Sequence, residues 1–117
     1  MTQTLQNNID APHLSFRLPE NFPGMAVYEA NLIEAAPFQA SRWTVEPGCG
    51  SPVDSHSVHE IWLVARGSGE LHYGGATHRV AAKDIVYFQP PEPHQVFNDG
   101  EEMLEIFSIW WHDAGNL

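Results

Sequence analysis

The sequence predicts an all-β domain, a sandwich or barrel of about eight or nine short strands. Three observations support this fold class. Apolar residues alternate with polar ones at a period near two after residue 24, and no segment carries a helical stripe. Nine Pro and nine Gly in 117 residues imply many turns. The length suits one domain, and an apolar content of 43% is enough for a core.

The expected strands are separated along the chain by turn residues. The pattern places them at 25–35, 38–46, 59–66, 70–73, 76–80, 84–88, 94–98 and 103–112. Gly74-Gly75 would make a two-residue hairpin turn. Residues 1–24 are polar and contain three prolines, so we expect an extended N-terminal arm with a short strand at 13–18, followed by a single barrel domain at 25–117.

The charge and composition restrict the partners of this chain. Fifteen Asp and Glu against five Lys and Arg give a net charge of −10, which disfavours nucleic acid and anionic membranes as partners. No stretch has the roughly 20 apolar residues of a membrane helix, and the N-terminus lacks the features of a secretory signal. A single cysteine, Cys49, excludes an intramolecular disulfide, so we expect a cytoplasmic protein. No Lys or Arg adjoins that thiol in sequence, and it receives no role.

Metal-ligating side chains cluster in one short segment. Asp54 and His56 point to the same side of an extended chain, and Glu60 lies an even number of residues further on. His94 follows a proline-rich turn and opens another strand, which could lie opposite the first three residues. Carboxylates and neutral imidazoles suit one divalent ion of Fe, Mn, Ni, Zn or Co, and two carboxylates would cancel its charge. These four residues are the predicted metal ligands.

The spacing of these residues resembles the two motifs of the cupin family. The first family motif runs Gly, five residues, His, one residue, His, three or four residues, Glu, six residues, Gly. The same spacing runs here from Gly48 to Gly67, with Asp54 in place of the first His. In the second motif His94 and Asn98 match. The departures there are Lys83, Gln89 and Pro91, which replace Gly, Pro and Gly. The resemblance implies a double-sheet jelly-roll barrel that holds the metal inside.

Asp54 leaves the ligand set open, because it stands where the family usually has a histidine. It could bind the metal directly, or orient His56 or a metal-bound water, or the metal could be absent. Without Asp54, the set of His56, Glu60 and His94 has the composition found in non-haem Fe(II) oxygenases. His59 has an odd offset from Glu60, so we expect it outside the barrel or at its mouth. A kink in this segment would make His59 an alternative ligand. In the plainest interpretation, both histidines of the segment are solvated loop residues.

Several further residues are expected to line the interior near this site. Trp62 and Val64 lie an even number of residues from Glu60 and so face the same side of their strand. Tyr73, Tyr87 and Gln89 have polar groups that could meet a ligand. The alternative for each is that it only fills the core. The predicted pocket-lining residues are Trp62, Val64, Tyr73, Tyr87 and Gln89.

The resemblance implies a small metalloenzyme of dioxygenase or isomerase type that acts on a small organic molecule, but the fold alone does not choose the reaction. The alternatives are a non-enzymatic cupin that binds or senses a small ligand, with or without metal, and a metal-free epimerase-like protein whose His and Asp residues we do not find. Trp110 and Trp111 must face opposite sides of the last strand. One of them would be exposed in a monomer, so we expect a homodimer.

Overall fold

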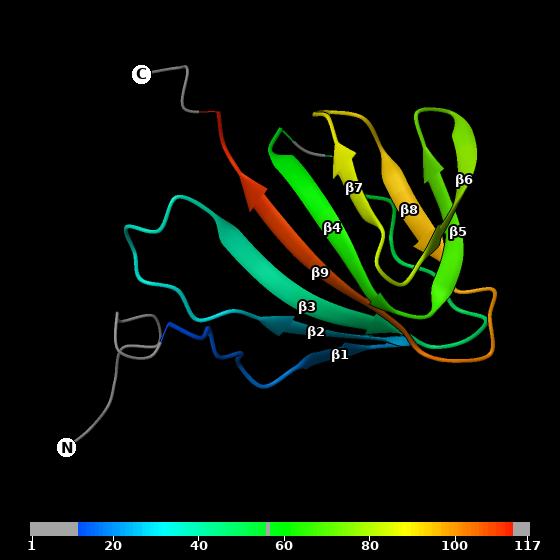
Figure 1. Cartoon of the computed structure of the whole chain (residues 1–117), viewed down its shortest axis with the longest axis horizontal. Coiled ribbons are helices and arrows are strands. Elements are labelled where there is room, and N and C mark those ends of the chain that lie inside the picture. Colours follow the sequence, from blue (N-terminus) through cyan, green and yellow to red (C-terminus); the bar gives the residue numbers. More distant parts are fainter. Residues whose placement is uncertain (1–11, 56, 114–117) are drawn as a thin grey trace.

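The computed structural model describes residues 12–55 and 57–113 (Figure 1). In this part of the chain nine strands form two sheets, with the strand orders β1-β2-β3-β9-β4-β7 and β6-β5-β8. The strands are β1 (Glu20–Phe22), β2 (Met25–Glu29), β3 (Gln39–Val45), β4 (His59–Arg66), β5 (Ser68–Tyr73), β6 (Ala76–Ala81), β7 (Ile85–Phe88), β8 (His94–Phe97) and β9 (Leu104–Trp111). The predicted all-β double-sheet fold is confirmed.

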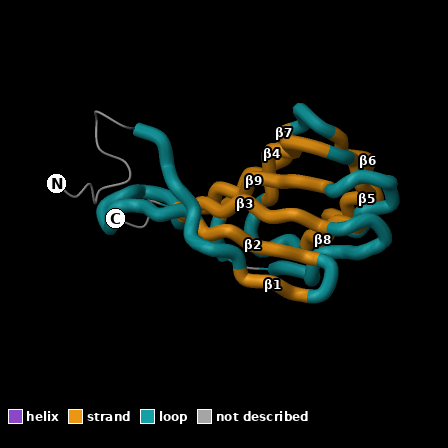
Figure 2. The backbone as a smooth tube through the Cα atoms, turned by 90° about the horizontal axis from the view of Figure 1, so that it is seen from below, coloured by secondary structure: helices purple, strands orange, loops and turns teal. Residues whose placement is uncertain are grey.

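The core lies between the two sheets, because alternate residues of each strand face inward. The register of the larger sheet brings the inward residues together: Val45 pairs with Leu104, and Ile106 pairs with both Trp43 and Val64. The smaller sheet adds Leu71, Val80 and Val96 from β5, β6 and β8. Figure 2 shows the same strands from below, with β1 at the outer end of the larger sheet.

Most strand positions agree with the sequence pattern, and the differences lie at the N-terminal end. The strand expected at 25–35 ends at Glu29, followed by a single bridge between Ala30 and Phe16. That bridge replaces the short strand expected at 13–18. Part of the predicted arm, β1, pairs with β2 as the edge strand of the larger sheet. Gly74 and Gly75 both have positive φ, as a two-residue hairpin turn requires.

The outer face of the larger sheet carries apolar side chains across three neighbouring strands. Two cross-strand rows, Ile109–Ile61–Tyr87 and Phe107–Leu63–Ile85, run over β9, β4 and β7. Ile85 is 64% exposed and Tyr87 is 48% exposed. An apolar face of this kind is typical of a contact surface.

Among the described residues, no helix is long and apolar enough to cross a membrane.

Candidate metal and ligand site

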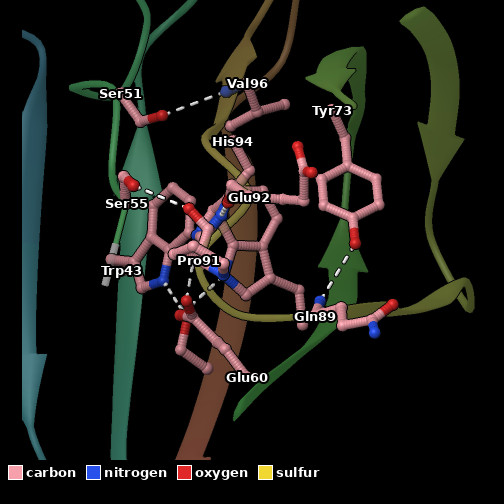
Figure 3. Close-up of polar contacts among 12 residues, drawn as sticks. Trp43, Ser51, Ser55, Glu60, Tyr73, Gln89, Pro91, Glu92, His94 and Val96 are labelled. Atoms are coloured by element: carbon pink, nitrogen blue, oxygen red, sulfur yellow. Dashed lines mark hydrogen bonds and ion pairs between the residues drawn. The ribbon is translucent and has the colours of Figure 1, made fainter. Parts of the chain in front are cut away.

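A buried carboxylate and a buried imidazole meet between the two sheets. Glu60 is the second residue of β4 in the larger sheet, and His94 is the first residue of β8 in the smaller one. Glu60 Oε1 lies 3.0 Å from His94 Nε2 (Figure 3). Glu60 is 7% exposed and His94 is 2% exposed. Two residues 34 positions apart therefore form a polar contact across the core.

Neighbouring groups fix the orientation of both side chains. Trp62 Nε1 donates a hydrogen bond of 2.9 Å to Glu60 Oε2, and His94 Nδ1 lies 3.2 Å from the carbonyl oxygen of Glu92. The ring of Phe88 stacks on His94 at a centroid distance of 4.1 Å and an angle of 2°. The carbonyl favours a proton on Nδ1, so Nε2 is the ring atom that faces the carboxylate. This is the arrangement in which a histidine binds a metal through Nε2.

The pKa values of the two groups shift in opposite directions. Burial has the largest influence on both and works against the charged forms, but it is outweighed. Hydrogen bonds from His94 and Trp62 lower the pKa of Glu60 below its usual value. The hydrogen bond to Glu60 raises the pKa of His94 above its usual value, with help from the Glu92 carbonyl. Each group therefore favours the charged form of the other, and a metal would compete with a proton for His94 Nε2.

Asp54 lies next to His94 through the backbone. Each residue donates its N–H to the carbonyl of the other, at 3.0 and 2.9 Å. The Asp54 side chain is exposed and borders the cavity described below. The predicted ligand His56 lies outside the described residues. In the ranges 12–55 and 57–113, no three His, Cys, Asp or Glu side chains are grouped closely enough to hold a metal. The described structure thus brings together Glu60 and His94, with Asp54 beside them.

His59 lies on the outer face of β4, away from Glu60. Its Nδ1 lies 2.5 Å from the hydroxyl of Tyr87 and its Nε2 lies 2.6 Å from Oδ1 of Asp113. Its ring stacks between Tyr87 and Trp111. The hypothesis that His59 is an alternative ligand is wrong, because β4 is regular here and successive side chains alternate. The prediction that Tyr87 lines the pocket is also wrong, because Tyr87 pairs with the outward-facing Ile61.

The other predicted pocket-lining residues are spread over different environments. Trp62 borders the cavity, whereas Val64, 3% exposed, belongs to the core between the sheets. Tyr73 packs against the core, and its hydroxyl accepts a 3.0 Å hydrogen bond from the backbone N–H of Gln89. The side chain of Gln89 is exposed and does not line the cavity described below, so its expected place there is wrong: β7 ends one residue earlier, at Phe88.

A cavity of about 720 Å³ opens beside Glu60, over β2, β3 and β9 and the segment that contains Asp54. Trp43 and Trp110 line it together with Trp62. The indole N–H of Trp43 donates a 2.8 Å hydrogen bond to the hydroxyl of Ser108, which itself bonds to Glu60.

Sequence reasoning did not identify Trp43, Phe88 and Ser108 as site residues. Phe88 faces His94 because it pairs with Glu60, and Trp43 meets Ser108 because β3 pairs with β9. The one available signal was the alternation of side chains: Val86 and Phe88 are both apolar and lie on the same face of the strand expected at 84–88.

Comparison with known proteins connects this geometry to a family. The family model described as Cupin domain matches residues 41–110. A cupin 2 conserved barrel domain protein from Salinispora arenicola is 32% identical, with a TM-score of 0.71 over 86% of this chain and 83% of that one. A mutant of Bacillus subtilis oxalate decarboxylase is 25% identical, with a TM-score of 0.75 over 83% of this chain and 28% of that one.

A curated relative, auxin-binding protein 1 of Arabidopsis thaliana, is 32% identical over 76 residues. The match covers 56% of this chain and 38% of the relative's length.

Proposed function

We propose that this chain, which belongs to the cupin family, binds one divalent transition metal ion inside its barrel and acts as a small metalloenzyme on a small organic molecule. The observation that carries the proposal is the contact between Glu60 and His94. A carboxylate and an imidazole from opposite sheets converge in the core beside a cavity of about 720 Å³. Buried ionisable pairs next to a cavity are candidates for function.

The two groups fit a metal in chemistry and in separation. Carboxylate oxygen and imidazole nitrogen are ligands of divalent first-row ions. Two donors at about 2.0–2.2 Å from one ion and at right angles to each other lie about 3 Å apart. The two donor atoms here are 3.0 Å apart. His56 and Asp54 would complete the ligand set, Asp54 directly or through a water. When bound, the ion would supply Lewis-acid or redox chemistry. The similarity to an oxalate decarboxylase supports an enzyme, without indicating this chain's substrate.

The second candidate is a cupin that binds or senses a small ligand without metal. The specific observation in its favour is that Glu60 and His94 hydrogen-bond to each other directly, with Trp62 satisfying the other carboxylate oxygen. Such a pair is a complete structural contact without any ion. The similarity to a protein named for auxin binding supports a binding role.

Metal analysis of the purified chain separates these two functions. The protein is stripped with a chelator and dialysed anaerobically against Fe(II), Mn(II), Ni(II) or Zn(II), and bound metal is measured by mass spectrometry. We expect one ion per chain in the wild type and none in His94→Ala. Retention in Asp54→Ala would place Asp54 outside the direct ligands.

The matched control for this experiment is His72→Ala. His72 lies 3.0 Å from Glu70, the same separation as in the buried pair, but it is exposed on β5. This variant should keep the metal. A wild-type protein that binds none of the four ions in stoichiometric amount would refute the metalloenzyme and favour the metal-free ligand binder. Circular dichroism shows whether each variant is folded.

A further inference from the structure

The cavity wall is aromatic, and two of its three indole N–H groups already donate hydrogen bonds within the protein. Trp43, Trp62 and Trp110 line it, and the rings of the first two meet edge to face at 4.9 Å. The N–H of Trp43 donates to Ser108, and that of Trp62 donates to Glu60. The tryptophans therefore offer ring surface to a ligand, while neither of these two N–H groups is available to hold an anionic oxygen.

The ionisable side chains among the described lining residues of the cavity are both acidic. Asp54 and Glu60 line it, and among its described lining residues there is no Lys, Arg or His. His94 bonds to Glu60 but is not part of the lining. The chain as a whole carries a net charge of −10. His94 offsets the charge of Glu60, so an anion that enters would be repelled mainly by the exposed carboxylate of Asp54 and by the net charge of the chain. A cation would be attracted by Asp54 and by the tryptophan faces.

From these observations we infer that, in the metal-free protein, the cavity takes a molecule with an aromatic ring and an uncharged or cationic polar group, and rejects ring compounds that carry a carboxylate. The inference rests on the proposed function in one respect, since it places the ligand in the same cavity. A volume of about 720 Å³ lies within the range of about 300–1,000 Å³ typical of small-molecule sites, so one or two rings fit.

Three probes that share one ring and differ in charge test the inference. 2-Phenylethanol, 2-phenylethylamine and phenylacetate are titrated into chelator-treated protein at about pH 7.5, where they are neutral, cationic and anionic. None absorbs at the red edge of tryptophan excitation, so tryptophan fluorescence reports binding, and calorimetry gives the affinities. We expect phenylacetate to bind at least about tenfold more weakly than the other two. Equal affinity for phenylacetate and 2-phenylethanol would overturn the inference, as would failure of all three to bind.

Adjacent tryptophans on β9 provide a matched pair of variants. Trp110 lines the cavity, whereas Trp111 lies on the opposite face against His59. Trp110→Ala should weaken 2-phenylethanol binding about tenfold and Trp111→Ala less than about twofold. Equal effects of the two substitutions would show that the ring binds elsewhere. Asp54→Asn should reduce the difference in affinity between 2-phenylethylamine and phenylacetate. An unchanged difference in affinity would contradict the electrostatic argument.

The outcome is separable from that of the proposed function. Metal content is measured on the same preparations, and the probe affinities are taken without metal. A protein that binds no metal but discriminates the three probes would refute the metalloenzyme and leave the ligand class standing. A protein that binds metal but binds phenylacetate as tightly as 2-phenylethanol would support the metal site and refute the inferred ligand class.

Discussion

In the metal-free protein the contact between His94 and Glu60 should contribute strongly to stability. The variants to compare with the wild type are His94→Gln, Glu60→Gln and the double variant. Loss of His94 removes the imidazole that lies 3.0 Å from the buried Glu60 carboxylate and favours its charged form, while the contacts with Trp62 and Ser108 remain. Breaking one side of a buried pair typically costs about 3–5 kcal/mol, because the remaining charge stays desolvated.

The geometry bounds how strongly the two residues are coupled. Opposite charges 3.0 Å apart attract by about 5.5 kcal/mol at an effective dielectric constant of about 20. Desolvation of both groups cancels part of this attraction, and a charge-assisted hydrogen bond contributes about 1.5–3 kcal/mol net. We therefore expect a coupling energy of about 2–3 kcal/mol from the double-mutant cycle.

The coupling should depend on pH in a defined direction. The folded pKa of His94 is raised above the usual 6.5, so its contribution is complete below that pH and is lost as the pH rises through the folded value. The folded pKa of Glu60 is lowered below the usual 4.5, so its contribution is present above that pH and is lost as the pH falls through the folded value. The pair should therefore stabilise the protein most between pH 4.5 and 6.5.

Urea unfolding of chelator-treated protein, followed by tryptophan fluorescence, measures these free energies at about pH 5.5 and about pH 8.5. His72→Gln is the control: its 3.0 Å contact with Glu70 is exposed, so it should cost less than about 1 kcal/mol. A coupling energy below about 0.5 kcal/mol, or one that grows from the lower to the higher pH, would refute the reasoning.

Three further predictions concern the backbone, the metal and assembly. Gly67→Ala should lower the free energy of unfolding more than Gly75→Ala. Both glycines have positive φ, so either substitution adds about 1–3 kcal/mol of backbone strain. Only at Gly67 would the added Cβ also meet a backbone oxygen, that of Met103 at 2.6 Å. Equal urea midpoints would contradict this. A metal at about 100 times its dissociation constant should add about 2.7 kcal/mol, seen as a rise in Tm that is absent in His94→Ala. Light scattering should give twice the 13.1 kDa chain mass, and Ile109→Glu on the outer face should give a monomer; a wild-type monomer would refute the homodimer.

The alternation of apolar residues was sufficient to predict most strands and, for much of their length, which side chains point into the core. It placed a strand at 59–66 with Glu60, Trp62 and Val64 on one side, and the structure has the same strand with those three residues buried. It also placed His59 on the other side. The reason is local: successive side chains of an extended chain point to opposite faces whatever the rest of the fold does.

The alternation of side chains alone did not decide which face of β7 points inward. Ile85 and Tyr87 form one apolar set, and Val86 and Phe88 form another, so the pattern is ambiguous. Pairing of Phe88 with Glu60 decides it, and that pairing depends on a neighbouring strand 28 positions away in the chain. For the same reason Tyr87 was expected inside and Phe88 was overlooked.

By itself, then, the sequence determined the all-β class, the positions of most strands and the spacing that marks Glu60 and His94 as candidate ligands. Only the tertiary structure decided that these two groups meet at 3.0 Å, that Trp43 and Ser108 stand beside them, and that a cavity with acidic and aromatic walls opens there. Facing within one strand follows from backbone geometry, whereas contacts between sheets follow from register and packing among residues far apart in the chain.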